Sequence, residues 1–314
     1  MFVQTLFKVK FPDKKQHMLA PFLKKNDQIR IISPSGAIAS KYIDGAAKIL
    51  TSWGFVCSEG TNARKNYGRF AGTKEERIAD LQAALDNPNI KAILCSRGGY
   101  GLSQIIDKID FSGFIKSPKW LIGFSDITIL HNAINNLGFA SIHGIMAKHI
   151  TELAENTEQV EHLRQILTGN FPKYQIASHP LNRAGKATGK LIGGNLSVLA
   201  GMRGSRFDLT YTNNILFIED IGEQAYHIDR LIQNLRFSGV LEQISGLIVG
   251  QFSDCKEDPL MKQSIIESIL EAVKSYNYPV CFNFPAGHVD YNLALVLGAD
   301  VTLEITNSKV LLNW

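Results

Sequence analysis

The residues best suited to chemistry lie in the tetrapeptide Gly123-Phe124-Ser125-Asp126. It stands between the apolar run 120–122 and a segment, 127–137, whose apolar residues have helical spacing. A serine between a strand and a helix occupies a sharp turn, which exposes its hydroxyl and aims the following backbone N–H groups at the atom under attack. Serine is a weak nucleophile unless a base stands beside it. The turn therefore predicts a nucleophile at Ser125, provided that the chain supplies a histidine and an acid.

Three histidines are candidates for the base. His288 follows the run 284–287 on a predicted loop after a strand, and loops placed by a rigid sheet often carry catalytic groups. His143 and His149 are six residues apart, which is neither the i,i+4 spacing of a helical metal site nor an H-E-x-x-H pattern. A lone loop histidine is more often a surface or packing residue. We nevertheless interpret His288 as the base, because the preceding glycine exposes its ring.

The leading candidate for the acid is Glu219, at the tip of the apolar run 215–218. A carboxylate there is costly to bury without a partner, and a strand end can orient an imidazole as a triad acid must. Asp220 and Glu223 are rivals. Either acidic residue is also suited to capping the helix that follows. The local sequence leaves this choice open.

A glycine-rich turn, Gly98-Gly99-Tyr100-Gly101, follows a predicted strand and opens a helix, so its N–H groups face an anion-binding position. It is not a dinucleotide fingerprint, since the third glycine position counted from Gly99 is Gln104, and no Walker sequence is present. An oxyanion hole is a better interpretation, with one N–H from this turn and one from Asp126. The alternative is a plain tight turn.

The elements that position these residues alternate between strands and helices in the first half. We predict strands at 28–32, 90–95 and 120–124, and helices at about 40–53, 74–86 and 102–109. Thr73 and Glu76 form a capping box for the second helix. Such alternation indicates a parallel sheet with its functional loops at the carboxyl ends of the strands.

The second half is predicted as a smaller mixed α/β unit. A polar stretch with Pro172 and Pro180 leads into it, and its glycine-rich opening, 185–195, is expected to form turns. Predicted strands follow at 215–219, 246–251, 279–283, 293–297 and 300–305, with helices at about 224–236 and 258–275. The predicted domains are an arm (1–18), an N-terminal α/β domain (19–155), a linker (156–185) and a C-terminal α/β domain (186–314).

Composition excludes several classes of protein. The 33 basic and 29 acidic residues leave a net charge of +4, too balanced to indicate a nucleic-acid partner. No stretch reaches the roughly 18 apolar residues of a membrane span, and the start lacks a basic signal region. The four cysteines form no C-x-x-C pair and are expected to be buried free thiols. We therefore predict a cytoplasmic protein with no membrane partner.

The four motifs together resemble the LD-carboxypeptidase family of serine peptidases. They are the runs 96–101, 123–128, 218–223 and 287–292, and the resemblance extends from about Leu19 to Trp314. The serine turn is not an α/β-hydrolase elbow, which reads G-x-S-x-G, because Ile127 occupies the fifth position. Since relatives begin shortly before the first strand, residues 1–17 have no counterpart and Met18 is a candidate start.

The resemblance implies specific roles. Ser125 would be the nucleophile, His288 the base, and Glu219 the acid that orients it, with oxyanion donors at the N–H groups of Gly99 and Asp126. It implies a flavodoxin-like parallel-sheet N-terminal domain and a smaller, swivelling-type mixed α/β domain, with the site between them. It also implies a homodimer, no metal or other cofactor, and a small peptide substrate, the murein tetrapeptide, from which the terminal D-alanine is released. The cleft should mix cationic and acidic groups, and Arg97 and Arg203 are candidate contributors or structural ion pairs.

Two other functions compete. A microcin C-type self-immunity peptidase would need an aromatic surface for a nucleobase, and the second half has only the terminal Trp314 as tryptophan. A non-catalytic α/β module would use the glycine turns to hold a small anion, and Ser125→Ala would leave its function intact. A metal enzyme sensitive to chelators would point instead to His143 and His149.

Overall fold

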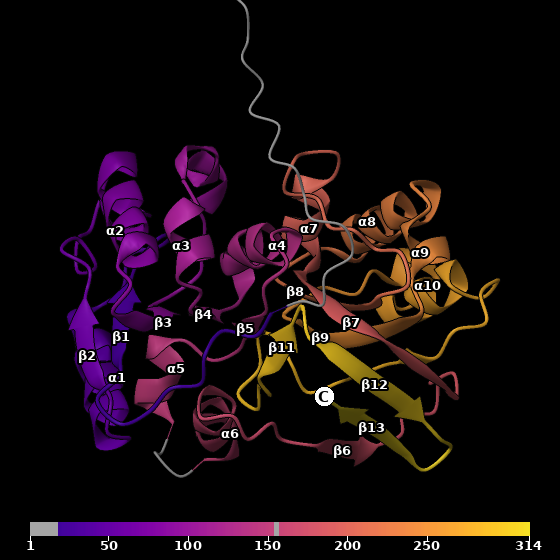
Figure 1. Cartoon of the computed structure of the whole chain (residues 1–314). Helices are drawn as coiled ribbons and strands as arrows, with labels where there is room; N and C mark the ends of the chain where they lie inside the picture. Colours follow the sequence, from indigo (N-terminus) through magenta and orange to yellow (C-terminus); the bar gives the residue numbers. More distant parts are fainter. Residues whose placement is uncertain (1–17, 154–156) are drawn as a thin grey trace, which may run out of the picture.

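The computed structural model describes residues 18–153 and 157–314 and contains two β-sheets side by side (Figure 1). The first has six strands in the order β11-β5-β4-β3-β1-β2 and is parallel except for β11. Its strands are β1 (Gln28–Ile32), β2 (Val56–Glu59), β3 (Ile90–Cys95), β4 (Trp120–Gly123), β5 (Ser141–His143) and β11 (Leu295–Leu297). The predicted α/β fold with a parallel-rich N-terminal sheet is confirmed.

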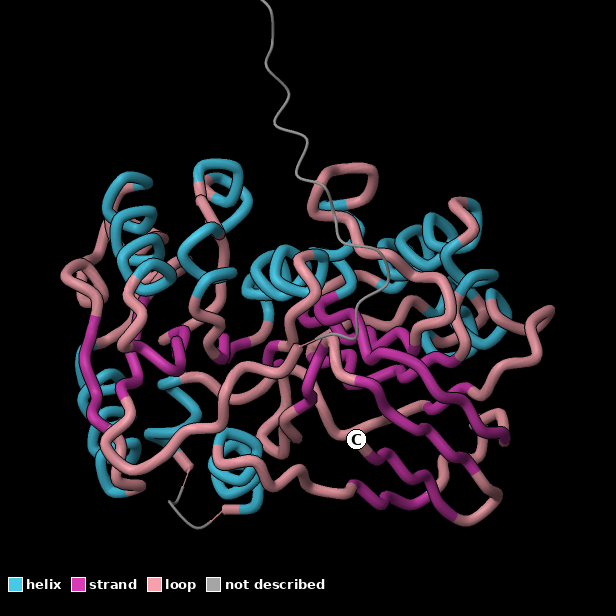
Figure 2. The backbone as a smooth tube through the Cα atoms, in the orientation of Figure 1, coloured by secondary structure: helices cyan, strands magenta, loops and turns pink. Residues whose placement is uncertain are grey.

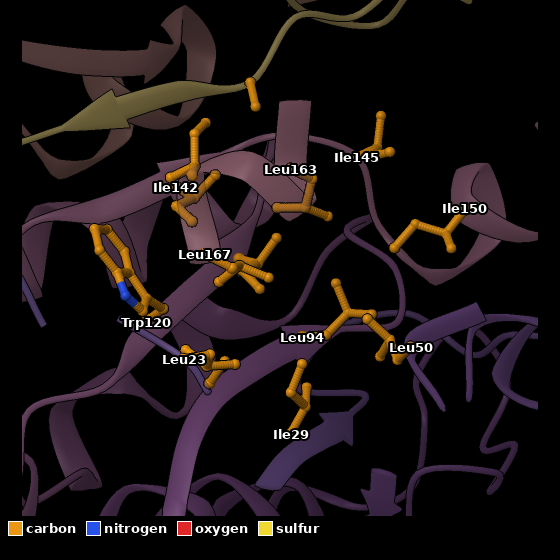
Figure 3. Packing of buried hydrophobic residues seen from close by; sticks show 14 of the residues in the cluster. Leu23, Ile29, Leu50, Leu94, Trp120, Ile142, Ile145, Ile150, Leu163 and Leu167 are labelled. Atoms are coloured by element: carbon orange, nitrogen blue, oxygen red, sulfur yellow. The ribbon is translucent and has the colours of Figure 1, made fainter. Parts of the chain in front are cut away.

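Helices cover both faces of this sheet (Figures 1 and 2). One face carries α1 (Ser40–Ser52), α5 (Ala147–Glu152) and α6 (Glu158–Leu167). The other carries α2 (Lys74–Asp86), α3 (Ser112–Lys116) and α4 (Thr128–Asn136). Figure 3 shows the first of the two cores, in which Trp120 and Ile142 of the sheet pack near Leu163 and Leu167 of α6. Burial on both faces explains why these strands are almost continuously apolar.

Local signals set most of these boundaries. The Thr73 hydroxyl accepts from the Glu76 N–H and the Glu76 carboxylate from the Thr73 N–H, so the predicted capping box at the start of α2 is confirmed. The predicted helix 102–109 is instead two short 3₁₀ turns, η1 (Leu102–Gln104) and η2 (Ile106–Lys108). Met18 forms a bridge with Phe139. The rest of the predicted arm, residues 1–17, lies outside the described residues.

The second sheet has seven strands in the order β10-β9-β8-β7-β12-β13-β6. The pairs among β10, β9, β8 and β7 are parallel and those among β7, β12, β13 and β6 antiparallel. Its helices pack on one face, where they share a core with the sheet. The strands are β6 (Tyr174–Ala177), β7 (Gly185–Asn195), β8 (Ile215–Ile221), β9 (Gly246–Ser253), β10 (Val280–Cys281), β12 (Asp300–Ile305) and β13 (Lys309–Asn313), and the helices are α7 (Leu196–Met202), α8 (Ala225–Phe237), α9 (Val240–Gln243) and α10 (Ile265–Ala272), with the 3₁₀ turn η4 (Pro259–Met261) before α10.

Three segments differ from expectation. The run 185–195, expected to form turns, is the strand β7, because β8 and β12 pair with it on its two sides and so override its glycine content. The expected linker 156–185 contains α6 and β6, and α6 buries its apolar residues in the core of the first sheet. Strand β11, expected in the second unit, joins the first sheet beside β5.

Strand β11 links the two halves because its alternating side chains enter different cores. Val296 packs in the core of the first sheet, whereas Leu295 and Leu297 pack against the second. A second link is the bond from the Asn195 N–H to Thr128 Oγ1, 3.1 Å long, between the end of β7 and the start of α4. None of the helices in the described ranges is both long and apolar enough to cross a membrane.

Candidate active site

The serine turn follows β4 directly. Ser125 has φ +67°, a left-handed conformation that costs a non-glycine residue energy and is retained only where its surroundings enforce it. Gly123, at the end of β4, is held from two sides: its carbonyl accepts from His131 Nε2 at 2.8 Å and from the Gly144 N–H at 3.2 Å. The 3₁₀ turn η3 (Ser125–Ile127) then leads into α4. The turn thus has the strained strand-to-helix geometry of a nucleophile.

The Gly98–Gly99 turn packs directly on this serine. A Cβ added to Gly98 would lie 2.8 Å from Ser125 Cβ and 3.0 Å from its Oγ, so only glycine permits the approach. Asp126 ties the two turns together, because its Oδ2 accepts from Ser35 Oγ at 2.6 Å and from the Leu102 N–H at 2.9 Å. Burial raises the pKa of this carboxyl. Its side chain is therefore a support for the turns.

The N–H groups proposed as oxyanion donors are unused. Within residues 18–153 and 157–314, neither the Gly99 nor the Asp126 N–H donates a hydrogen bond to the protein. Gly99 is exposed and has φ +103°, and Asp126 follows the serine directly. Unpaired donors beside a serine hydroxyl are what an oxyanion hole requires. The geometry is compatible with the role, which stays a prediction.

The structure brings Glu219 and His288 together. His288 Nδ1 lies 2.7 Å from Glu219 Oε2, and the Glu219 side chain is completely buried. Glu219 stands at a register shift between β8 and β9, the kind of irregularity that re-aims a side chain. Burial raises the pKa of the Glu219 carboxyl, and the hydrogen bond from His288 acts in the opposite direction. The pair can therefore hold His288 in the tautomer with a proton on Nδ1.

The rival acids have other partners. Asp220 accepts hydrogen bonds from Asn195 Nδ2 and from the N–H and hydroxyl of Ser197, which fastens α7 to the end of β8. Glu223 contacts His227 at 2.5 Å. The helix-capping alternative for Glu223 is not what the structure shows, because among the described residues its carboxylate contacts His227 and the Ser197 hydroxyl and accepts from no backbone N–H of α8. Among the three candidates, only Glu219 contacts His288.

His288 lies against the serine turn through Phe124. The two ring centroids are 4.8 Å apart, and the His288 side chain is 15% exposed. Among the contacts of the described residues, the Ser125 hydroxyl and His288 form no hydrogen bond. Such contacts often tighten only when substrate is bound. His288 thus packs on the residue that precedes Ser125, and a shared site with a bond between the serine and the histidine stays a prediction.

His143 and His149 also surround Phe124, at ring-centroid distances of 5.6 and 5.2 Å. Burial lowers the pKa of His143 well below its ordinary value and that of His149 to about 4. In the parts of the chain that are described, no group of three or more His, Cys, Asp or Glu side chains could hold a metal ion. Both histidines thus pack on Phe124, and burial favours their neutral form.

The two candidate arginines differ. Arg203 is paired with Asp208 at 2.9 Å and its guanidinium lies over Tyr211, so it is a structural residue. Arg97 is exposed and, among the residues that the structure describes, donates only to the Ala37 carbonyl, at 3.0 Å. Trp314, the one tryptophan of the second half, packs against Phe171 and Tyr174.

Known proteins resemble this chain over nearly its whole length. A family model described as the LD-carboxypeptidase N-terminal domain matches residues 29–144, and one described as the C-terminal domain matches residues 188–303. A probable murein peptide carboxypeptidase of Bacillus subtilis is 32% identical over 93% of this chain and 93% of its own. The chain belongs to the LD-carboxypeptidase family. The predicted family resemblance is confirmed.

Other LD-carboxypeptidases and their structural relatives extend this result. The murein tetrapeptide carboxypeptidase of Pseudomonas aeruginosa is 32% identical over 88% of this chain and 93% of its own. The crystal structure of muramoyltetrapeptide carboxypeptidase from Oxalobacter formigenes has a TM-score of 0.82 at 28% identity and covers 91% and 97% of the two chains. MccF in complex with glutamyl sulfamoyl guanosine has a TM-score of 0.83 at 24% identity, covering 94% and 98%, and shares the fold.

Sequence reasoning missed two supporting residues. His131 of α4 binds the Gly123 carbonyl and has Ser141 Oγ 2.9 Å from its Nδ1, while Ser35 binds Asp126. The signal for His131 was available, since it is a polar residue among the apolar positions of the helix after the serine turn. Ser35 carried no such signal, because its partner is 91 residues away.

Proposed function

We propose that the chain is a serine-type LD-carboxypeptidase that hydrolyses the L,D-amide of the murein tetrapeptide L-Ala-γ-D-Glu-diaminopimelate-D-Ala and releases the terminal D-alanine. The observation that carries this proposal is the hydrogen bond between buried Glu219 and His288, next to the strained turn at Ser125. A nucleophile, a base and an orienting acid are the minimum for acyl transfer by a serine. The membership of the family supplies the carboxypeptidase class.

The proposed reaction has two halves. His288 Nε2 takes the proton from the Ser125 hydroxyl, whose oxygen attacks the scissile carbonyl carbon, and Glu219 stabilises the imidazolium through Nδ1–H. The Gly99 and Asp126 N–H groups stabilise the negative oxygen of the tetrahedral intermediate. Its collapse breaks the C–N bond, and the leaving D-alanine amine takes the proton from His288. Water then hydrolyses the acyl-enzyme by the same steps, which restores Ser125.

The choice of substrate rests on relatives. Murein peptide and murein tetrapeptide carboxypeptidases are the printed names of the Bacillus subtilis and Pseudomonas aeruginosa relatives, and we extend that substrate class to this chain. Independence of metal ions belongs to the same proposal, because the proposed groups already provide nucleophile, base and oxyanion donors. No particular observation favours the microcin-type or the anion-binding alternative.

A cytoplasmic location and a homodimeric state are also part of the proposal. All four cysteines are free, which agrees with a reducing compartment. Cys95 and Cys281 are buried, and burial raises the pKa of the Cys281 thiol to about 12. They are therefore unreactive packing residues. The homodimer is supported by the family resemblance.

The test is to incubate purified protein with the tetrapeptide in the presence of EDTA and to measure D-alanine by mass spectrometry. We expect release by the wild type and none by Ser125→Ala or His288→Ala. His179→Ala, which changes a loop histidine outside the site, is the matched control and should retain activity. Full activity in Ser125→Ala would contradict the proposal. Cleavage of an aminoacyl sulfamoyl nucleotide, with none of the tetrapeptide, would instead support the microcin-type alternative.

A further inference from the structure

Several cationic side chains belong to the loops and helices of the first half of the chain, and some are already engaged. Arg64 and Lys65 form ion pairs with acidic side chains of the first half of the chain. Arg77 is buried and donates to the carbonyls of Pro34 and Gly101. The charges of Arg64 and Lys65 are therefore paired, and the Arg77 guanidinium is engaged with backbone carbonyls.

Arg97 is different in both exposure and partners. It is exposed, lies two residues before Gly99, and makes no ion pair with any described carboxylate. Its one hydrogen bond to the described part of the chain uses Nη1, which donates to the Ala37 carbonyl at 3.0 Å. Since a guanidinium has five N–H donors in a planar fork, most of those of Arg97 are free for a ligand.

The stem of Arg97 is held beside the proposed oxyanion turn. A Cβ on Gly36 would lie 2.9 Å from the Gly98 carbonyl oxygen and 3.8 Å from Arg97 Cδ, and Gly98 itself packs on Ser125. The Gly36 N–H also donates to the Gly98 carbonyl at 3.0 Å. The guanidinium therefore projects from the same small group of loops that surrounds the serine.

The substrate of a carboxypeptidase places an anion in the same region. Only the amide nitrogen and one Cα separate the terminal carboxylate from the scissile carbonyl carbon. When the carbonyl oxygen points to the Gly99 N–H, the carboxylate must lie a few bonds away from that turn. A guanidinium matches a carboxylate with two parallel charge-assisted hydrogen bonds.

We propose that Arg97 binds the terminal carboxylate of the leaving residue and so selects substrates with a free C-terminus. This inference rests on the proposed function and adds a specificity residue to it. Arg97 does not take part in the bond-breaking steps. Its contact with Ala37 pre-orients the side chain, which lowers the entropy lost when the carboxylate binds.

The test compares two peptides, the tetrapeptide and its C-terminal carboxamide, with wild type and Arg97→Gln. We expect the wild type to prefer the free acid. Arg97→Gln should lower kcat/KM for the acid by about 10- to 100-fold, mainly through KM, since it removes a charge-assisted contact. It should change kcat/KM for the carboxamide by no more than about threefold. Arg97→Lys should be intermediate, because a lysine keeps the charge without the fork.

Arg69→Gln is the matched control. Arg69 is exposed on the neighbouring loop, where its backbone carbonyl accepts from the Ala37 N–H, and its side chain makes no hydrogen bond or ion pair within residues 18–153 and 157–314. Its replacement also removes one positive charge from this part of the molecule. It should leave kcat/KM unchanged for both the free acid and the carboxamide. An Arg69→Gln loss as large as that of Arg97→Gln would overturn the proposal, because it would show a general effect of charge.

Two further outcomes would overturn it. Equal losses on acid and carboxamide in Arg97→Gln would show that Arg97 acts only by holding the Ala37 loop. A wild type that cleaves both peptides equally would show that the carboxylate is not recognised, while the proposed function would stand. A wild type inactive on both peptides would contradict the proposed function and the subsite with it.

Discussion

Glu219 Oε2 lies 2.7 Å from His288 Nδ1, although the two residues are 69 positions apart in the chain. Strand β8 delivers the carboxylate, and the loop that runs from β10 to β11 delivers the imidazole. Because the Glu219 side chain is completely buried, this hydrogen bond acts in a medium of low dielectric, where it is stronger than in water. The orientation of the His288 ring therefore depends on Glu219, which β8 of the second sheet holds in place.

We expect Glu219→Gln to lower kcat by about a thousandfold or more, because the amide cannot stabilise the imidazolium or select its tautomer. Stability should change little, since the amide occupies nearly the same volume. The measurements are steady-state kinetics and urea unfolding of the same preparations. Retained activity would show that Glu219 is not the orienting acid.

Asp220→Asn should lower the stability of the protein and have little effect on kcat. The Asp220 carboxylate accepts from donors of Asn195, Ser197 and Ile221, and an amide would place its own N–H groups against some of them. We expect a loss of about 2 kcal/mol in the free energy of unfolding and a much smaller change in kcat. A stable but inactive Asp220→Asn would point to a direct part in the reaction.

Gly287→Ala should disrupt the site. Gly287 has φ +126°, and an added Cβ would lie 2.9 Å from Glu219 Oε2 and 3.0 Å from Glu219 Cβ. We expect activity to be lost and the free energy of unfolding to fall by at least about 2 kcal/mol. Gly222→Ala is the control, since Gly222 also has positive φ but open space around it. It should cost about 1 kcal/mol and retain activity.

Two replacements of Ser125 distinguish the effect of its strained backbone from the effect of its hydroxyl group. At φ +67°, alanine keeps the backbone strain and glycine relieves it. Both variants should be inactive, but Ser125→Gly should be more stable than Ser125→Ala by about 1 kcal/mol in urea unfolding. If alanine is the more stable of the two, as at an ordinary position, the turn is not strained.

The buried histidines predict a loss of stability in mild acid. Burial lowers the pKa of His131 to about 4, whereas an unfolded histidine titrates near about 6.5. Between about pH 4 and about pH 6.5, His131 is therefore protonated in the unfolded chain and neutral in the folded chain. The free energy of unfolding keeps its full value above about pH 6.5 and falls as the pH drops. The protonation of His131 alone lowers it by about 3 kcal/mol at pH 4.

His131→Asn tests whether His131 causes the loss of stability at low pH. At pH 7.5 the variant should be less stable than the wild type, because the imidazole contacts with the Gly123 carbonyl and Ser141 are lost. As pH falls, only the wild type pays the His131 protonation penalty, so the two unfolding free energies should converge near about pH 5. Parallel curves across this range would contradict the shifted pKa.

Much of the fold could be predicted because its signals are local. The run from Trp120 to Gly123 reads as a buried strand, and the Thr73–Glu76 capping box marks the start of a helix. Three of the five parallel strands, β1, β3 and β4, were predicted from such alternation, whereas β2, β5 and the order of the strands were not. Strand β7 could not be predicted this way, because the partners that stabilise its glycine-rich sequence, β8 and β12, lie far along the chain.

The sequence by itself determined that a serine turn, a glycine-rich turn, a strand-end acid and a loop histidine exist, and its motifs indicated the family. Only the tertiary structure showed which acid contacts His288: both Glu219 and Asp220 stand at the end of β8, but Glu219 bonds to His288 and Asp220 to Asn195. It also showed that Arg203 forms an ion pair with Asp208, whereas Arg97 donates to the Ala37 carbonyl. The physical reason is that a side chain's role depends on its partners in space, and these partners come from other elements.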